Sequence, residues 1–436
     1  MVDSFSALQT VGAAFWVCNI IFMLDGAAYF GILNILTLFL HKQLQMTDLQ
    51  AGTYVGVFLT GAVTIFAAVF GFVVDKLGVK RSIFLNILIA LVGRSLLAVA
   101  PEFKSYTMLP DVTLFGVSLA GPASNVVAAV ALLLMAFSAG LLQSALYAGV
   151  KQSTDARTSA VGFSLLYALM NGGIVVESLI SSPVRARYDT VGVMWLCVAI
   201  TVIYLVLHLV VFPKDAGARV TVDRKGESWL SAILEMLNPR FVFFIFILLG
   251  VRTLFAHQWL TMPAYITRSY PAAVGERFEW INALNPFIIL VGTPLVAALT
   301  SKVHVVKMMI VGTLVSASAT FLLVPGPNVI ALLTYVTIFS IGEALWSSRF
   351  YEYVANLAPP DRVGVYMGWA SIPWFLAKTI TGPFSGWMLG IYCPDGGPFR
   401  TGEMWLIYGL IGMTSPIGLI LASKWLMAPP KGPKAV

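Results

Sequence analysis

The sequence has very little charge for its length. Charged residues make up 11% of its 436 residues, whereas hydrophobic residues make up 58%. So few charges cannot give a chain of this size a soluble surface, so the composition excludes a soluble globular protein. The chain also lacks a phosphate-binding loop of the GxxxxGK[ST] type, so nothing in it indicates ATP-driven chemistry. The net charge of +7 therefore bears on orientation in a membrane and not on nucleic acid.

Cysteine is also scarce. Cys18, Cys197 and Cys393 are odd in number and far apart, and none belongs to a CxxC or Cys/His pattern. This distribution predicts neither a disulfide framework nor a metal site, and we interpret the cysteines as apolar filler. The amino terminus has no basic residue before its first apolar run and no small-residue cleavage site. We therefore expect that run to be retained as a helix and not removed as a signal peptide.

Long apolar runs occupy most of the chain. Each is long enough to cross ~30 Å of hydrocarbon, which takes about 20 residues. Proline, glycine and charged clusters separate the runs, as expected at helix ends. The sequence therefore predicts an all-α membrane protein with twelve transmembrane helices, at residues 12–40, 50–74, 82–100, 123–149, 158–182, 191–212, 240–268, 279–300, 304–324, 327–356, 364–391 and 403–427.

The most polar and least periodic stretch divides these runs into six and six. We predict an amino-terminal bundle at 1–212, a cytoplasmic linker at 213–239 and a carboxy-terminal bundle at 240–436. With the amino terminus inside, the inner connections hold more than twice as many basic residues as the outer ones. Because short basic loops face the cytoplasm, both termini are predicted to be cytoplasmic, in the plasma (inner) membrane.

A short basic turn joins the second and third runs. It has the spacing G-x-x-x-D-K-x-G-x-K-R, with Gly71, Asp75, Lys76, Gly78 and Arg81 at fixed intervals. An ordinary basic loop would explain the cations but not these glycines and this aspartate. The turn resembles the loop signature between helices two and three of the major facilitator superfamily. That resemblance implies two six-helix bundles that rock about a central cavity, with this turn stabilising one end state.

Charged side chains at lipid depth are costly, by about 3 kcal/mol or more, and so indicate function. In the superfamily, helices one, four, seven and ten line the cavity, which favours Asp25, Arg252 and Glu343. Arg349 and Glu352 lie three residues apart and could simply neutralise each other. The full set is Asp25, Arg94, Glu177, Arg252, Glu343, Arg349, Glu352 and Lys378.

Around Glu343 the resemblance becomes narrower. The segment I-G-E-A-L-W-S-S at 341–348, then L-A-P at 357–359 and Y-M-G at 366–368, is similar to helices ten and eleven of proton-coupled oligopeptide transporters. The segment N-A-L-N-P-F-I-I at 282–289 is similar to their helix eight, and Tyr167 with Asn171 to their helix five. The resemblance covers scattered pieces of about half the chain.

The resemblance implies roles for particular residues. Glu343 would receive a peptide amino group, a strong pairing when water is excluded. Asn285 would be the binding-site asparagine, and Tyr29 a side-wall contact. Asp25 would be a candidate proton carrier. Arg252, Trp346 and Asn171 complete the predicted substrate-binding set.

The amino-terminal half departs from the family in its cations. The family's E-x-x-E-R becomes Phe22-x-x-Asp25-Gly26, Leu33 replaces a later arginine, and helix four lacks the lysine. A substrate carboxylate would then face apolar wall, which is heavily penalised. Either Arg94 or Arg252 replaces the missing cations, or the cargo is a cation, an amide or an esterified peptide-like molecule. The residues slightly favour the second alternative. Four tryptophans would suit a bulky or cationic ligand, or serve only in packing: Trp259, Trp346, Trp369 and Trp374.

Proton coupling requires a carboxylate that binds and releases a proton at membrane depth. Asp25, Glu177 and Glu343 qualify by position. Glu177 lies among small residues and could instead be a hydrogen-bonded structural carboxylate. His257 could be a pH switch, although a solvated, hydrogen-bonded histidine is the simpler interpretation.

We therefore expect a monomeric secondary transporter in the lipid bilayer that moves a small peptide-like or amino-acid-derived solute by proton-coupled symport. The proton is the coupling ion, and no other cofactor, metal or nucleic acid is expected. The alternative is a proton-driven exporter of drug-like or cationic amphiphilic compounds. An enzyme is not expected, because no catalytic grouping appears at lipid depth. A nontransporting receptor would usually have a degraded 71–81 turn or an added soluble domain.

Overall fold

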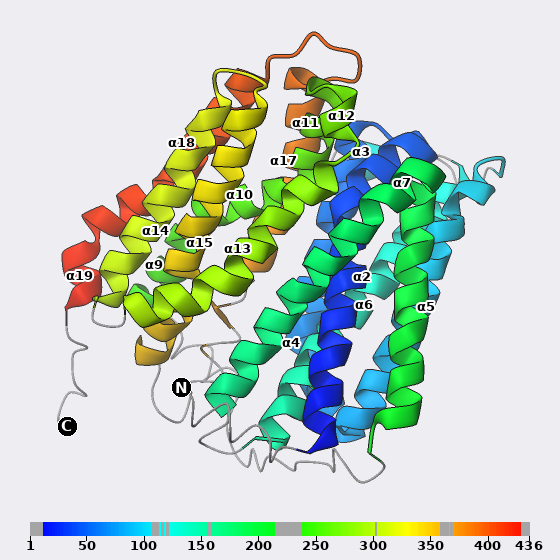
Figure 1. Ribbon diagram of the computed structural model, residues 1–436, viewed down its shortest axis with the longest axis horizontal. Coiled ribbons are helices and arrows are strands. Elements are labelled where there is room, and N and C mark those ends of the chain that lie inside the picture. The colour runs from blue at the N-terminus through cyan, green and yellow to red at the C-terminus, as the bar shows by residue number, and fades with distance from the viewer. Residues whose placement is uncertain are drawn as a thin grey trace. The chain divides into compact units, whose positions relative to one another are not determined.

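The computed structural model describes residues 12–106, 113–114, 117–118, 122–154, 159–213, 238–300, 303–357, 366, 369–370 and 372–428. Within this part of the chain the structure is almost entirely helical (Figure 1). The exception is a short antiparallel ladder of β1 (Thr113–Leu114) and β2 (Val117–Ser118), in which Thr113 pairs with Ser118.

The first half of the sequence forms long helices, one of which holds two expected spans. Helix α7 includes the expected runs 158–182 and 191–212, and its helical geometry breaks at Asp189, where φ is 55°. The helical segment that follows α2 contains a π-helical stretch, η2, whose wider turns interrupt the regular α-helical hydrogen bonding. The elements are α2 (Ala13–Leu44), α3 (Asp48–Thr53), η2 (Tyr54–Gly61), α4 (Ala62–Leu77), α5 (Val79–Val99), η3 (Ala100–Phe103), α6 (Ala123–Gln152) and α7 (Ser159–Val211).

The second half begins with three short consecutive helices, α9 to α11. Its elements are α9 (Pro239–Ile247), α10 (Leu249–Leu260), α11 (Met262–Ser269), α12 (Ala272–Gly275), α13 (Phe278–Leu299), α14 (Val305–Ala319), η4 (Thr320–Leu323), α15 (Val329–Leu357), α17 (Ile372–Tyr392), α18 (Thr401–Leu421) and α19 (Ser423–Met427). Each of the twelve expected runs coincides with helical structure over much of its length.

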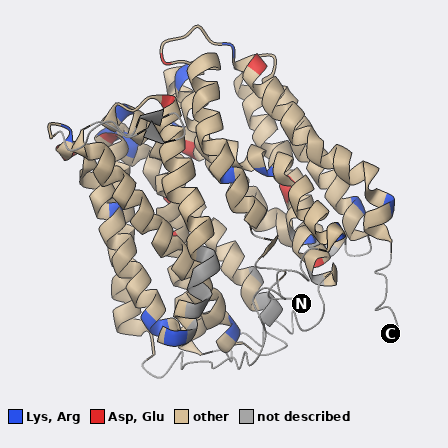
Figure 2. Cartoon of the chain, turned by 180° about the vertical axis from the view of Figure 1, so that it is seen from behind, with Lys and Arg blue, Asp and Glu red and all other residues tan. Residues whose placement is uncertain are grey.

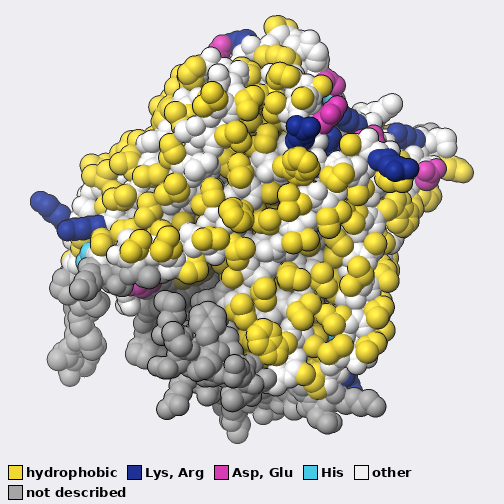
Figure 3. Space-filling view, in the orientation of Figure 1, with side chains coloured by type: hydrophobic (Ala, Val, Ile, Leu, Met, Phe, Trp, Pro, Cys, Tyr) yellow, Lys and Arg dark blue, Asp and Glu magenta, His cyan; other side chains and the backbone are white. Residues whose placement is uncertain are grey.

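Membrane spans can be counted from length and hydropathy. Within the described ranges, ten helices are long and apolar enough to cross a membrane. One of them, Leu165–Val211, is 47 residues long, which is more than twice what a single span needs. Large apolar side chains are widely exposed, including Leu421 at 81% and Val210 at 76%. Figure 3 shows the same for one face, where hydrophobic side chains cover most of the visible surface. Lipid contact explains this exposure.

The chain divides into two compact units that do not follow the two halves of the sequence. The first contains Met1–Val222, His257–Leu290 and Lys378–Phe399, and the second contains Asp223–Ala256, Val291–Ala377 and Arg400–Val436. The first unit therefore holds α11, α12 and parts of α10, α13 and α17 together with α2 to α7. Of the predicted linker, residues 214–237 lie outside the described part, so the predicted boundaries remain predictions.

Each unit has its own packed interior. In the first, Phe15, Ile21, Ile83, Leu146 and Tyr204 belong to one buried apolar cluster contributed by α2, α5, α6 and α7. In the second, α14 packs against α15 and α18. Small residues allow this close approach: a Cβ atom at Gly312 would lie 2.9 Å from the Gly342 carbonyl oxygen of α15.

Candidate functional site

Few charged residues lie in the middle of the helices; most lie near helix ends (Figure 2). The first buried group joins α2, α5 and α7. Arg94 Nη2 donates to Asp25 Oδ1 at 2.7 Å, and Arg94 Nη1 donates to Thr201 Oγ1 at 2.6 Å and to Tyr204 Oη at 2.8 Å. The Tyr204 hydroxyl donates to the same Asp25 oxygen at 3.0 Å. Asp25 and Arg94 thus neutralise each other inside the first unit. Because Arg94 is already paired with Asp25, it is less suited to bind a substrate carboxylate in place of the missing amino-terminal cations.

Glu177 on α7 differs from Asp25 because no cation among the described residues balances its charge. Its side chain is 1% exposed, and its Oε1 atom has no hydrogen-bond partner among the described residues. Within the same part of the chain it forms no ion pair. The carboxyl group lies directly against α2, since a Cβ atom at Gly31 would fall 2.5 Å from Glu177 Oε1. A carboxylate in such surroundings is costly unless it is protonated.

Arg252 on α10 is the corresponding cation in the second unit. Its side chain is 4% exposed, and it makes no hydrogen bond or ion pair with another described residue. Three rings surround it instead: its guanidinium carbon lies 4.4 Å from the centre of the Phe350 ring, 5.7 Å from Trp374 and 5.8 Å from Trp346. Trp346 is 4% exposed, and its Nε1 donor has no partner in the described part of the chain.

Other predicted binding residues are distributed over the two units. Asn285 is buried on α13 in the first unit, as is Asn171 on α7, whose amide nitrogen donates to the Tyr167 carbonyl at 2.9 Å. Tyr29 is half-buried on α2, with its ring centre 5.3 Å from that of Phe30. Glu343 is half-buried on α15 in the second unit, one turn before Trp346. The structure therefore brings Arg252 and Trp346 together, and the remaining binding roles stay predictions.

Arg349, Glu352 and His257 are further candidates with titratable side chains. Arg349 and Glu352 form the pair expected from their spacing, and Arg349 also donates to the Thr300 carbonyl at 2.7 Å. His257 is 1% exposed, with Nδ1 at 2.8 Å from Thr261 Oγ1. It is hydrogen-bonded as expected, but the expectation that it is solvated is wrong, because α10 turns it into the packed interior.

The predicted gating turn at 71–81 is mostly helical: α4 runs to Leu77, α5 begins at Val79, and only Gly78 lies between them. Gly78 has φ 80° and ψ 160°, a conformation that favours glycine, and its N–H donates to the Val74 carbonyl at 2.8 Å. Lys80 Nζ donates to the carbonyls of Phe212 and Pro213, both at 3.0 Å, so the turn is tied to the end of α7. Lys76 and Arg81 are exposed. The side chain of Asp75 and the surroundings of Gly71 lie outside the described part.

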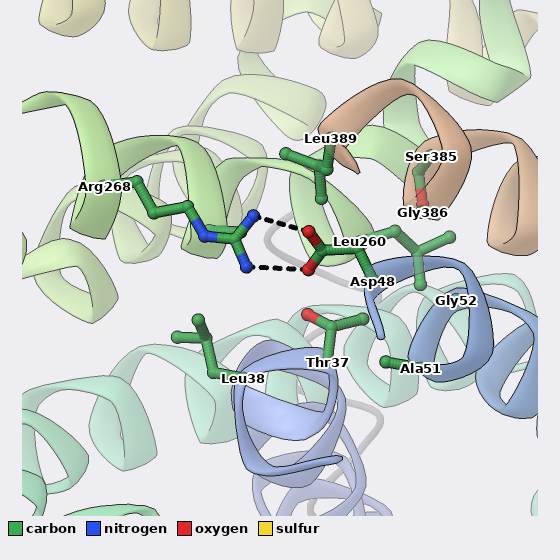
Figure 4. Close-up of a pocket in the computed structure, with 11 residues that line it drawn as sticks. Thr37, Leu38, Asp48, Ala51, Gly52, Leu260, Arg268, Ser385, Gly386 and Leu389 are labelled. Carbon is green, nitrogen blue, oxygen red and sulfur yellow. Dashed lines mark hydrogen bonds and ion pairs between the residues drawn. The ribbon is translucent and has the colours of Figure 1, made fainter. Parts of the chain in front are cut away.

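Sequence reasoning missed an ion pair that joins the two halves of the sequence inside the first unit. Arg268 of α11 donates to both carboxylate oxygens of Asp48 on α3, at 2.8 and 2.7 Å (Figure 4). It also donates to the Cys393 carbonyl at 3.0 Å. The two side chains are only 5% and 13% exposed. The cavity beside them measures about 10 Å³, room for no more than a single water. This end of the unit is therefore sealed.

A second pair and a glycine contact reinforce this closure. Arg185 of α7 donates to both carboxylate oxygens of Glu279 on α13, and Glu279 is fully buried. Helices η2 and α17 approach so closely that a Cβ atom at Gly56 would lie 2.8 Å from Pro383 Cδ. We call Asp48–Arg268 and Arg185–Glu279 the bridging pairs. In the sequence these residues looked like ordinary charges near helix ends, and no local pattern linked them.

These observations define a helical protein with many membrane spans and buried charges at membrane depth, which is the class of the membrane transporters. The chain belongs to the Major Facilitator Superfamily, whose sequence profile matches residues 15–270. It is 23% identical over 354 residues to the uncharacterized MFS-type transporter YttB of Bacillus subtilis (strain 168), covering 79% of this chain and 80% of that protein.

Solved structures of transporters share the fold. The peptide transporter POT in complex with sulfate matches with a TM-score of 0.73 at 16% identity, over 95% of this chain and 94% of that one. The nucleoside transporter NupG matches with a TM-score of 0.72 at 14% identity, over 95% and 100%. A POT family transporter in complex with 5-aminolevulinic acid matches with a TM-score of 0.70 at 14% identity, over 95% and 96%. At these identities the likeness shows the fold alone.

The comparisons confirm the predicted fold class and superfamily. The chain is an integral membrane protein and a secondary transporter of a small-molecule solute, and it is not an enzyme. The narrower resemblance to oligopeptide transporters, the coupling to protons and the cytoplasmic position of the termini stay predictions.

Proposed function

We propose that this chain is a proton-coupled symporter of a small peptide-like or amino-acid-derived solute. The observation that carries the proposal is Glu177, a carboxyl group that is buried in a membrane-spanning helix and that no cation among the described residues balances. Intramembrane carboxyl groups of this kind mark proton pathways, because the protonated form is tolerated in the packed state and the charged form is not.

Coupling would act through the contact between α2 and α7. Protonated Glu177 fits against the backbone of Gly31. Deprotonation would place a negative charge at that contact, and its desolvation would favour a packing that admits water. Because α2 also carries Tyr29, a shift of α2 against α7 would move a predicted substrate contact. Proton release and solute release would thereby be linked.

Asp25 is the less suitable carrier for this role. Its charge is already compensated by Arg94, and removing the charge by protonation would leave a buried arginine without a counter-ion. The pair is better suited to holding α2, α5 and α7 together. Glu343 remains a candidate for the amino group of the solute, with Asn285, Tyr29, Asn171 and Trp346 as further contacts.

The alternative of an exporter of cationic compounds has less support. An aromatic-lined site for a cation needs a negative or neutral centre, whereas Phe350, Trp346 and Trp374 already enclose the cation Arg252. A second cation in the same cluster would be repelled.

The test is a Glu177→Gln protein in proteoliposomes. Glutamine keeps the size of the side chain but cannot release a proton, so we expect a labelled dipeptide to exchange across the membrane but not to accumulate in response to an inward proton gradient. Glu403→Gln, which changes an exposed carboxylate, serves as the matched control and should accumulate dipeptide as the parent does. Gradient-driven accumulation by Glu177→Gln at the parent level would remove Glu177 from the mechanism.

A further inference from the structure

We propose that Arg252 is the centre of an anion-binding subsite that receives the carboxylate of the solute, with an apolar or aromatic group of the solute packed beside it. This inference rests on the proposed function and narrows its substrate class to small carboxylates. From the sequence alone, a cargo without a free carboxylate was slightly favoured. The surroundings of Arg252 reverse that preference.

The first argument is the missing counter-ion. A buried guanidinium is costly unless it is paired, and the structure pairs its other lipid-depth arginines: Arg94 with Asp25 and Arg349 with Glu352. Among the described residues, Arg252 meets the faces of three rings and no carboxylate, and the rings offset part of the cost. Its Nε donor has no partner among the described residues, which is also true of Arg94 and Arg349, so the missing counter-ion is what distinguishes Arg252. An oxyanion from outside the protein would supply what is missing.

The second argument is a second orphaned donor nearby. Trp346 is buried, its ring centre lies 5.8 Å from the guanidinium carbon, and its Nε1–H is unused within the described part of the chain. Indole nitrogen can only donate, and so can guanidinium. Two neighbouring donors and no described acceptor select a negatively charged, oxygen-bearing group.

The third argument concerns the rest of the solute. Phe350 and Trp374 flank the guanidinium at 4.4 and 5.7 Å, so a group attached to the carboxylate would meet ring surface. Glu343 lies on the same face of α15 as Trp346 and Phe350, three and seven residues before them. A solute that carries both an ammonium group and a carboxylate would therefore find receptors for both in the second unit, on α15 and α10.

Equilibrium binding without a proton gradient tests the subsite. The probes are the dipeptide alanyl-phenylalanine and its carboxamide, which have the same shape and the same ammonium group and differ only in the carboxylate. We expect the purified parent protein to bind the acid about 10-fold or more tightly than the amide, the range of a charge-assisted hydrogen bond. Equal binding of the two, or no saturable binding of the acid, would overturn the inference.

Variants locate the effect. In Arg252→Gln the preference for the acid should fall to about twofold or less while the affinity for the amide stays unchanged, and Arg252→Lys should keep part of the preference. Trp346→Phe keeps a ring but removes the Nε1 donor, so the preference should fall there too, which provides a test even where Arg252→Gln does not fold. Arg277→Gln, at an exposed arginine, is the control. An unchanged preference in Arg252→Gln or in Trp346→Phe would contradict the subsite.

The two proposals can fail separately. Gradient-driven uptake that survives in Glu177→Gln would refute the proton carrier without touching the preference for the acid. A parent protein that accumulates dipeptide with the gradient but binds acid and amide equally would refute only the subsite.

Discussion

Replacing Asp48 by asparagine should loosen the sealed end of the first unit. Asp48 on α3 and Arg268 on α11 come from the two halves of the sequence, and they meet through two charge-assisted hydrogen bonds. Transport by rocking of two helix bundles requires such helix ends to separate. We expect the pair to part when these helix ends separate, so weakening it should shift the equilibrium towards the open arrangement.

The size of the shift follows from burial. Removing one partner of a buried ion pair costs about 3–5 kcal/mol. The Arg268 and Asp48 side chains keep 5% and 13% exposure, and asparagine retains one acceptor, so we take about 2 kcal/mol. At about 1.4 kcal/mol for each factor of ten, the open population should rise about 30-fold.

Cys393 provides the assay. It is fully buried, its carbonyl accepts from Arg268, and burial raises the pKa of its thiol to about 12. The thiolate is the reactive form, so a maleimide should label Cys393 only when this end opens to water. In a Cys18→Ala, Cys197→Ala background, Asp48→Asn should speed labelling about 30-fold, in line with the population estimate.

Two control variants test whether faster labelling depends on the Asp48–Arg268 pair. Glu403→Gln breaks an exposed pair within one helix turn and should leave the labelling rate unchanged. Exchanging the charges, with Asp48→Arg and Arg268→Asp together, should restore much of the slow rate, as a coupled pair requires. A rate in Asp48→Asn equal to that of the Glu403→Gln control would refute the role of this pair in closure.

Two other predictions concern packing in the first unit. Asp25→Asn leaves Arg94 buried without a counter-ion and should destabilise the protein by about 3–5 kcal/mol, seen as a lower thermal midpoint of the purified protein. Asp25→Leu combined with Arg94→Met should recover most of this loss. An unchanged midpoint for Asp25→Asn would contradict the pairing. Gly56→Ala places a Cβ atom 2.8 Å from Pro383 Cδ and should destabilise by about 1–3 kcal/mol, whereas Gly172→Ala, with nothing within 4 Å, should not. Equal midpoints for the two alanine variants would show that η2 and α17 are not in contact.

The helices and the break at Gly78 could be predicted from the sequence because their causes are local. Hydrocarbon requires long apolar runs, and each expected run contains a helix. The turn at Gly78 could be predicted for the same reason, since its positive φ favours glycine whatever surrounds it. The division of α7 was expected between residues 182 and 191, and the helix breaks at Asp189.

The pairing of buried charges could not be predicted, because it depends on which helices meet. Asp25 and Arg94 are 69 residues apart, and Asp48 and Arg268 are 220 apart, so no local spacing connects them. Hydropathy marks Asp25, Glu177 and Arg252 alike as charges at lipid depth. Only the fold distinguishes a neutralised carboxylate from one that has no cation, and an arginine with a counter-ion from one enclosed by rings.

The central claim is that the solute enters with a proton and carries a carboxylate. The most direct measurement is uptake of labelled alanyl-phenylalanine and of its carboxamide into proteoliposomes, each with and without an inward proton gradient. We predict that the acid accumulates only with the gradient and that the amide accumulates about 10-fold more slowly or less. Accumulation of the acid without a gradient would contradict proton coupling, and accumulation of the amide at the same rate as the acid would contradict recognition of the carboxylate by Arg252.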